Sequence, residues 1–246
     1  MRLENRDLRI EIRKTRNMVS CRLWVVHEKL SLTERTRNDA DIVDLTLPDK
    51  FTVGDVPLRE VITKRRSRRK FAKKPLTLEE LSFLLWSTQG VKEVFDNKVT
   101  LRTVPSAGAR HPFETYLAIH DVEGIKPGLY RYLALEHKLL FLKEVDELPR
   151  KLIEASLGQR FVGECAVTFI WTVIPYRTEW RYAQASHKVI AIDIGHVCQN
   201  LYLAAEAIGA GTCAVAAYDQ SKMDSLIGVD GEEEFVIYMA PVGKLE

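Results

Sequence analysis

Apolar residues keep helical spacing most clearly over residues 187–208, and Gly209 follows as a stop signal. The apolar face of this stretch is wide, which predicts a helix buried on several sides. A second helix is predicted from Leu78 to Gly90, because Thr77 and Glu80 form a capping box ahead of leucines that share one face. Shorter helices are expected over residues 58–63 and 146–158 and from Asp219 to Gly228.

Runs rich in β-branched, aromatic and leucine residues predict strands between these helices. Residues 128–142 are typical of a hairpin whose turn falls near Glu136 and His137. Helices and strands interleave without clean βαβ repeats, which favours the α+β class with helices packed around a central sheet. The other strands are expected over residues 113–120, 164–173, 212–217 and 235–242.

The pattern changes near residue 40. Residues 1–40 are polar and basic with weak periodicity, which is typical of an extension that forms a helix or stays partly disordered. Residues 41–57 contain two prolines and a glycine, a composition that predicts a linker. We therefore expect an N-terminal extension over 1–40 and one folded domain over 41–246.

The composition excludes several classes of protein. With 46% hydrophobic and 28% charged residues in a chain of 246, an ordinary globular protein is indicated. No apolar run reaches the ~18 residues of a membrane span and the N-terminus has no apolar signal core, so a cytoplasmic location is predicted. The cysteines stand alone and are expected to be reduced core residues rather than zinc ligands. They are Cys21, Cys165, Cys198 and Cys213.

Charge is distributed unevenly behind a net value of +2. Residues 1–74 hold 20 basic and 11 acidic side chains, and residues 75–246 hold 16 and 23, so the balances are +9 and −7. Six of the seven residues from Lys64 to Lys70 are cationic. Arginines bind phosphate bidentately and Ser67 adds a hydroxyl, so a phosphate site, a nucleic-acid patch and a solvated face are the open interpretations. The lack of interleaved aromatic residues disfavours nucleic acid.

Two other segments are rich in small residues that let a ligand approach the backbone. Pro105 to Pro112 predicts a ligand-facing loop or a plain turn, and Gly209 to Asp219 predicts either a ligand-facing strand or tight helix–strand packing. Asp193 and His196 lie three positions apart on the long helix and are expected to pair for structural reasons. Because no catalytic side chain stands out, any reaction is expected to belong to a cofactor.

Taken in order, these segments resemble the FMN-dependent nitroreductase family. The Ser-Ala-Gly loop at 106–108 and the Asp-x-Gly-His sequence at 193–196 are further similar to the branch that includes azoline dehydrogenases, which oxidise thiazoline or oxazoline rings in modified peptides. The matching segments are Arg65 to Phe71, Leu78 to Gly90, Pro105 to Gly108, Gly128 to Tyr132, Asp193 to Leu201, Gly209 to Asp219 and Pro241 to Lys244.

The resemblance implies a mainly antiparallel central sheet flanked by helices, in an intertwined homodimer with FMN at the subunit interface. NADH or NADPH would reduce FMN, and a nitro, quinone or other small acceptor would reoxidise it. The alternatives are dehydrogenation of azoline rings in a modified peptide and, from another class, a non-catalytic nucleic-acid-binding module.

The resemblance also identifies residues for the cofactor. It implies no catalytic side chain, and it places the backbone of Ala216 and Ala217 near flavin N5 and O4. The residues that match cofactor contacts are Arg65, Arg66, Ser67, Arg69, Pro105, Ser106, Ala107, Gly108, Gln159, Ala216, Ala217 and Lys244.

Overall fold

The fold is built on a seven-stranded sheet with the order β1-β6-β5-β4-β7-β9-β8. The computed structural model describes residues 41–95 and 99–246, so the expectation for residues 1–40 lies outside the described residues. Each neighbouring pair of strands in the sheet is antiparallel, which confirms the predicted α+β class. The strands are β1 (Ile42–Asp44), β4 (Phe113–Ile119), β5 (Gly128–Leu133), β6 (Lys138–Lys143), β7 (Val167–Val173), β8 (Ala210–Thr212) and β9 (Phe235–Lys244).

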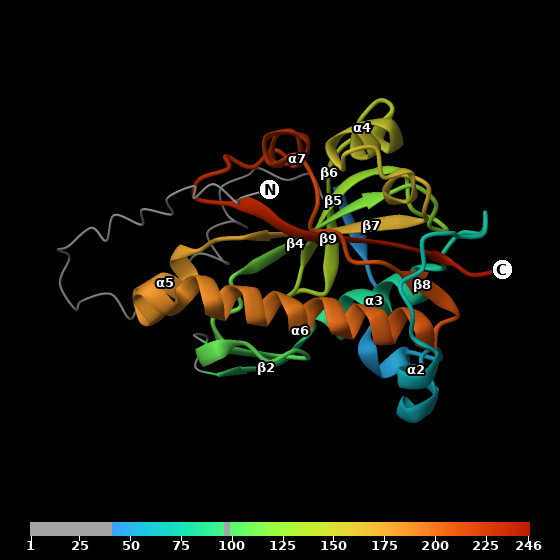
Figure 1. Ribbon diagram of the computed structural model, residues 1–246. Coiled ribbons are helices and arrows are strands. Elements are labelled where there is room, and N and C mark those ends of the chain that lie inside the picture. The colour runs from blue at the N-terminus through green and yellow to red at the C-terminus, as the bar shows by residue number, and fades with distance from the viewer. Residues whose placement is uncertain (1–40, 96–98) are drawn as a thin grey trace. The chain divides into compact units, whose positions relative to one another are not determined.

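Helices cover both faces of the sheet (Figure 1). They are α2 (Leu58–Lys64), α3 (Leu78–Gln89), α4 (Leu148–Ala155), α5 (Tyr176–Tyr182), α6 (Ser186–Ala207) and α7 (Gln220–Ile227). Short 3-10 turns lie at Pro48–Lys50, Ala107–Ala109, Arg160–Val162 and Ala183–Ala185. The predicted long helix is thus confirmed to within one residue at either end.

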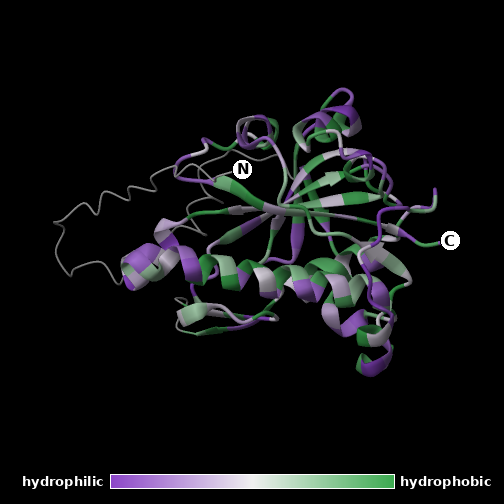
Figure 2. Ribbon diagram, in the orientation of Figure 1, coloured by the Kyte–Doolittle hydropathy of each residue, from purple (hydrophilic) through white to green (hydrophobic). Residues whose placement is uncertain are grey.

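The alternation of side chains along the central strands divides the core into two clusters. Leu117 of β4 packs in one cluster with Leu201 of α6 and with residues of α3. Ile170 of β7 packs in the other with Met223 of α7 and with residues of α4. Burying a leucine-sized side chain stabilises a protein by about 1.5–3 kcal/mol, so these clusters hold the helices on the sheet. Figure 2 shows α6 alternating between hydrophobic and hydrophilic residues, as a helix with one buried face should.

The capping box of α3 is confirmed. The Thr77 hydroxyl accepts a hydrogen bond from the Glu80 N–H at 3.1 Å, and the Glu80 carboxylate accepts one from the Thr77 N–H at 3.0 Å. The predicted hairpin over 128–142 is also confirmed, because β5 and β6 pair and His137 adopts a positive φ of 52° in the turn between them.

The prediction of a linker over residues 41–57 is wrong. Ile42 and Val43 of β1 pair with Leu140 and Leu139 of β6, and Leu45 is buried. The apolar residues at the start of this segment therefore complete an edge of the sheet. Pro48 and Gly54 mark turns only in the residues that follow this strand.

The predicted strand over residues 212–217 is also wrong in its extent. The β8–β9 ladder ends where Thr212 faces Val242, and only Val215 rejoins it, by two hydrogen bonds with Met239. In that register Cys213 stands opposite Pro241, and proline has no N–H to donate to a ladder. The strand therefore stops short. In the edge after β8, residues 213–217, Cys213 and Val215 are buried, whereas Ala216 and Ala217 are exposed.

The pattern of apolar residues did not predict the hairpin of β2 (Val91–Phe95) and β3 (Val99–Arg102) or the helix α5. Val94 and Phe95 are 47% and 45% exposed, so the hairpin buries no regular apolar face that a pattern could mark. In α5 only Thr178 is buried.

The expectation that the cysteines are core residues is confirmed for Cys198 and Cys213. Cys165, Cys198 and Cys213 are free thiols, two of them buried and Cys165 half-buried, while Cys21 lies outside the described residues. Within residues 41–95 and 99–246, no three His, Cys, Asp or Glu side chains are grouped to hold a metal ion. In the same residues, no helix combines the length and the apolar character that crossing a membrane requires.

Candidate functional site

The basic segment, Lys64 to Lys70, begins at the end of α2 and continues beside β8. The Arg68 N–H donates to the Thr212 carbonyl at 2.8 Å, and Ser67 bridges Thr212 in a parallel sense. The Ser67 hydroxyl lies 3.0 Å from the Tyr202 hydroxyl of α6, which also accepts the Ala214 N–H at 2.9 Å. Tyr202 therefore joins the basic segment to the edge after β8, a link that the sequence did not predict.

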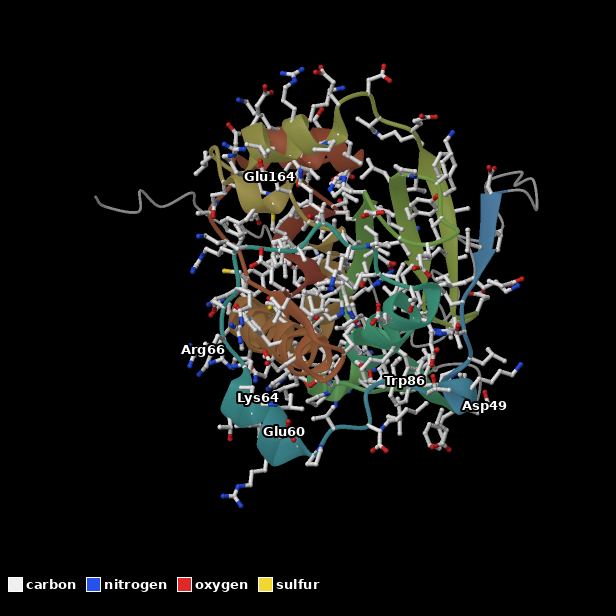
Figure 3. The ribbon with its side chains drawn as sticks, turned by 90° about the vertical axis from the view of Figure 1, so that its right-hand side faces the viewer. Asp49, Glu60, Lys64, Arg66, Trp86 and Glu164 are labelled. Carbon is white, nitrogen blue, oxygen red and sulfur yellow. The ribbon has the colours of Figure 1, made fainter. Side chains whose placement is uncertain are left out.

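Aromatic rings support two of the predicted arginines. The Arg65 guanidinium lies 5.4 Å from the centre of the Tyr202 ring, and the Arg69 guanidinium lies 5.8 Å from that of Phe161. Arg66 is exposed beside Lys64 (Figure 3), and within the described residues no hydrogen bond or ion pair engages its guanidinium. The segment therefore presents cationic groups at the surface, at least one of them available for an anion.

Arg68 differs from its neighbours because its stem packs against the backbone of β8. A Cβ atom at Gly211 would lie 2.5 Å from Arg68 Cγ, so a glycine is required for this close approach. The Arg68 guanidinium lies 3.9 Å from the Glu206 carboxylate. This contact seats the basic segment on the sheet.

Gln159 and the residues after β8 lie close together. Gln159 Nε2 donates to the Ala217 carbonyl at 2.8 Å and to the Ser156 carbonyl at 2.9 Å. Ala216 and Ala217 are exposed, and no hydrogen bond among the described residues uses their N–H groups. These two donors can meet acceptor atoms on the edge of a flat ligand.

The small-residue loop is tied to α6 instead. The Ser106 hydroxyl donates to the Asp193 carboxylate at 2.7 Å, and the Ala107 N–H donates to it at 3.0 Å. The expected pairing of Asp193 with His196 is therefore wrong: Asp193 is buried against the loop, whereas His196 is exposed on α6. The i, i+3 spacing did not reveal that the two side chains face opposite environments.

Residues of α5 lie against the same loop. A Cβ at Gly108 would come within 2.9 Å of the Tyr182 hydroxyl and 3.0 Å of Arg181 Nε, and the Arg110 guanidinium lies 5.0 Å from the centre of the Trp180 ring. No motif in the sequence marked these aromatic residues. The loop is thus enclosed between α5 and α6.

Titratable side chains at the end of the loop and beneath α5 are buried. Burial, and then the nearby Arg102, lowers the pKa of His111 to about 3, so this imidazole is neutral at physiological pH. The Glu114 carboxylate of β4 lies 2.6 Å from the Arg177 guanidinium of α5 and 2.8 Å from that of Arg131. Burial opposes ionisation of Glu114, but the two arginines outweigh it and lower its pKa. This network anchors α5 to the sheet.

Lys244 is engaged within the fold. Its Nζ donates to Glu80 Oε1 at 2.6 Å and to the Ile208 carbonyl at 2.9 Å. The ammonium therefore joins the end of β9 to the first turn of α3 and the last turn of α6.

The residues predicted for one ligand form two groups at different positions along α6. The basic segment, Gln159 and the edge after β8 lie near Tyr202, whereas the small-residue loop lies near Asp193. Nine residues of helix separate these two positions, which corresponds to roughly 14 Å. Figure 1 shows the segment after α2 beside β8 at one end of α6 and α5 at the other.

Comparison with known proteins gives a consistent family. Residues 62–244 match the model of the nitroreductase family. A protein named as a nitroreductase from Methanocaldococcus jannaschii is 32% identical over 204 residues, which cover 83% of this chain and 98% of that protein. The trifolitoxin-processing protein TfxB of Rhizobium leguminosarum is 32% identical over 133 residues, which are 52% of this chain and 36% of TfxB.

Solved structures share the fold. A crystal structure named as a nitroreductase from Ralstonia eutropha superposes with a TM-score of 0.69 at 24% identity, over 84% of this chain and 90% of that one. A chain of the Escherichia coli microcin synthetase McbBCD complex, with truncated pro-MccB17 bound, gives a TM-score of 0.62 at 18% identity, over 95% and 85%. At these identities the likeness concerns the fold alone.

Proposed function

Because the chain belongs to the nitroreductase family, and is therefore an oxidoreductase, we propose that it uses FMN as its cofactor. NADH or NADPH reduces the flavin in this proposal, and a nitro, quinone or other small acceptor reoxidises it. The observation that carries the proposal is that Tyr202 joins the cationic segment to the edge after β8, in which the N–H groups of Ala216 and Ala217 are unused.

The residues at this end of α6 fit a phosphorylated flat ring. Arg65, Arg66 and Arg69 would bind the phosphate, since guanidinium groups match phosphate oxygens in charge and geometry. The N–H groups of Ala216 and Ala217 are free to meet acceptor atoms on the ring edge. Pro105 to Gly108 would line the cofactor, and Gln159 would meet its pyrimidine edge.

Bound FMN would supply the hydride chemistry. The residues of this chain would hold the cofactor in one orientation, exclude water from one side of it and donate hydrogen bonds from the backbone of Ala216 and Ala217. No side chain of the site is required to act as a general acid or base. Lys244 is proposed to stabilise the fold near the cofactor, because its ammonium already binds Glu80 and Ile208.

We also propose that the active form is a homodimer. The small-residue loop and the basic segment contact α6 at two positions roughly 14 Å apart along the helix axis. In a two-fold symmetric dimer, the loop of one subunit can meet the basic segment of the other. Each FMN would then lie at the interface and be held by both subunits.

The FMN proposal is tested by purifying the full chain and titrating it with FMN, following the quenching of flavin fluorescence. The Arg66→Glu variant is expected to bind FMN at least about tenfold more weakly, because a charge-assisted contact to phosphate becomes a repulsion. The matched control is Lys73→Glu, which makes the same charge change at an exposed position outside the predicted set. A chain that takes up no FMN, or equal losses in both variants, would contradict the proposal.

A second candidate function is the dehydrogenation of azoline rings in a modified peptide. The likeness to TfxB, which is named for trifolitoxin processing, favours it. In this reaction the ring loses two hydrogen atoms to the flavin and becomes an azole. Mass spectrometry of a thiazoline-containing peptide incubated with the FMN-loaded chain tests it, with NAD(P)H-dependent reduction of a quinone measured in parallel. Loss of two hydrogens from the peptide supports this function, and an unchanged peptide contradicts it.

A further inference from the structure

The loop from Ser106 to His111 has a backbone that needs support. Gly108, Ala109 and His111 adopt positive φ angles of 61°, 52° and 44°. Residues other than glycine rarely adopt this left-handed conformation, because Cβ approaches the following carbonyl oxygen. Two of the three residues here carry a Cβ. The loop therefore needs contacts from elsewhere in the protein to keep its shape.

Asp193 supplies those contacts. Asp193 is on the buried side of α6, only 4% exposed, and its helix neighbours Ile190, Ile194 and Val197 belong to the core. A carboxylate without partners is costly at such a position. Both of its oxygens are within reach of donors from the loop, the Ser106 hydroxyl and the Ala107 N–H. The carboxylate and the loop thus satisfy each other.

The same bonds determine what the Ser106 hydroxyl can do. Its proton is donated to Asp193, and its oxygen accepts the His111 N–H at 3.0 Å. A hydroxyl has one proton to donate. While Asp193 holds that proton, Ser106 has none to offer a ligand, although the sequence suggested it as a ligand donor.

We propose that Asp193 is a positioning residue that holds the loop in its binding conformation, and that Ser106 acts through Asp193 rather than by direct contact with the cofactor. The assignment rests on the proposed FMN function. It leaves the ligand contacts of this loop to its backbone, since Gly108 itself faces Tyr182 and Arg181.

A double-mutant cycle on FMN affinity tests the proposal. Ser106→Ala is expected to raise the Kd for FMN by about tenfold in the otherwise wild-type chain, as is typical when a charge-assisted hydrogen bond is lost. In the Asp193→Ala background, the same substitution should change the Kd by less than about twofold, because its partner is already gone. The control is His196→Ala, an exposed residue of the same helix, which should leave the Kd unchanged.

A spectroscopic measurement and a rescue separate positioning from general stability. The visible circular dichroism of bound FMN should change in Asp193→Ala and remain as in the wild type in His196→Ala. Asp193→Asn should recover part of the affinity, because its amide oxygen can still accept the Ala107 N–H. If Ser106→Ala weakens binding equally in both backgrounds, Ser106 contacts the cofactor directly and the proposal is overturned.

A measurement without FMN keeps this proposal separate from the function on which it rests. Amide hydrogen exchange of residues 106–111 should be faster in Asp193→Ala than in the wild type and unchanged in His196→Ala. Unchanged exchange in Asp193→Ala would show that Asp193 does not hold the loop in place, whatever binds there, and would overturn the proposal. If the wild-type chain takes up no FMN while the exchange result holds, the FMN proposal is wrong and the role of Asp193 in holding the loop is supported.

Discussion

Lys244 Nζ lies 2.6 Å from Glu80 Oε1, although 164 residues separate the two in the sequence. Glu80 uses its other carboxylate oxygen to complete the capping box of α3 with the Thr77 N–H. One carboxylate therefore satisfies the start of a helix and neutralises the cation at the end of β9. The resemblance to flavin enzymes implied a cofactor contact for this lysine, and its position instead predicts a structural role.

The first prediction concerns that role. Lys244→Met should lower the free energy of unfolding by about 1–3 kcal/mol, because the Glu80 carboxylate and the Ile208 carbonyl each lose a partly buried donor. Urea unfolding measures the change, with Lys222→Met, an exposed lysine of α7, as the control that should have little effect. An unchanged stability together with a tenfold weaker FMN affinity would instead assign Lys244 to the ligand.

The second prediction concerns pH. Burial, reinforced by Arg102, lowers the pKa of His111 from 6.5 to about 3. Between pH 6.5 and pH 3, His111 is therefore protonated in the unfolded chain and neutral in the folded chain. The resulting stability is fully present above pH 6.5 and is lost as the pH falls toward 3. Between pH 7 and pH 5 this group alone should cost about 2 kcal/mol of unfolding free energy.

Urea unfolding at pH 7 and pH 5 tests this assignment in the His111→Asn variant. Asparagine tolerates the positive φ at this position and does not titrate. The variant should lose less stability on acidification than the wild type, whereas the exposed control His187→Asn should behave as the wild type does. Equal acid sensitivity in wild type and His111→Asn would show that another group is responsible.

The third prediction compares two glycines. Gly211→Ala should destabilise the protein by about 1–3 kcal/mol, because the new methyl group would overlap the Arg68 stem and push the basic segment off β8. Gly195→Ala in α6 has no atom within 4 Å of the added methyl and should be stabilising by about 0.5–1 kcal/mol. Thermal unfolding measures both, and FMN titration of Gly211→Ala should show weaker binding. If Gly211→Ala leaves the stability unchanged, the close packing of the Arg68 stem against Gly211 would be contradicted.

The fourth prediction tests the shared site. Arg66→Glu and Asp193→Ala subunits should each bind FMN poorly alone. If each site combines the basic segment of one subunit with the loop of the other, a heterodimer of the two variants contains one doubly altered and one intact site. Co-expression with two different affinity tags and sequential purification should then restore about half of the wild-type FMN per dimer. No recovery in the heterodimer would place both groups in one subunit's site.

Most secondary structure could be predicted because the signals are local. The capping box at Thr77 and Glu80 and the apolar spacing over 187–208 depend on residues within a turn or two of each other. The errors arose where a distant residue intervened. Pro241 ends the β8 ladder opposite Cys213, and the free edge of β6 recruits residues 42–44. Pro241 and β6 are both far along the sequence from the segments they affect, so local patterns could not reveal either effect.

For the candidate site, the sequence by itself determined the family and the segments that carry its motifs, because their order and residue types can be compared directly. Only the tertiary structure decided what the side chains do. In the folded chain the Ser106 hydroxyl donates to Asp193, 87 residues away, and Lys244 donates to Glu80. Arg65 and Arg69 pack on aromatic rings that no motif in the sequence marked. A hydrogen-bond donor reaches only about 3 Å, so its partner is settled by packing between distant segments rather than by spacing along the chain.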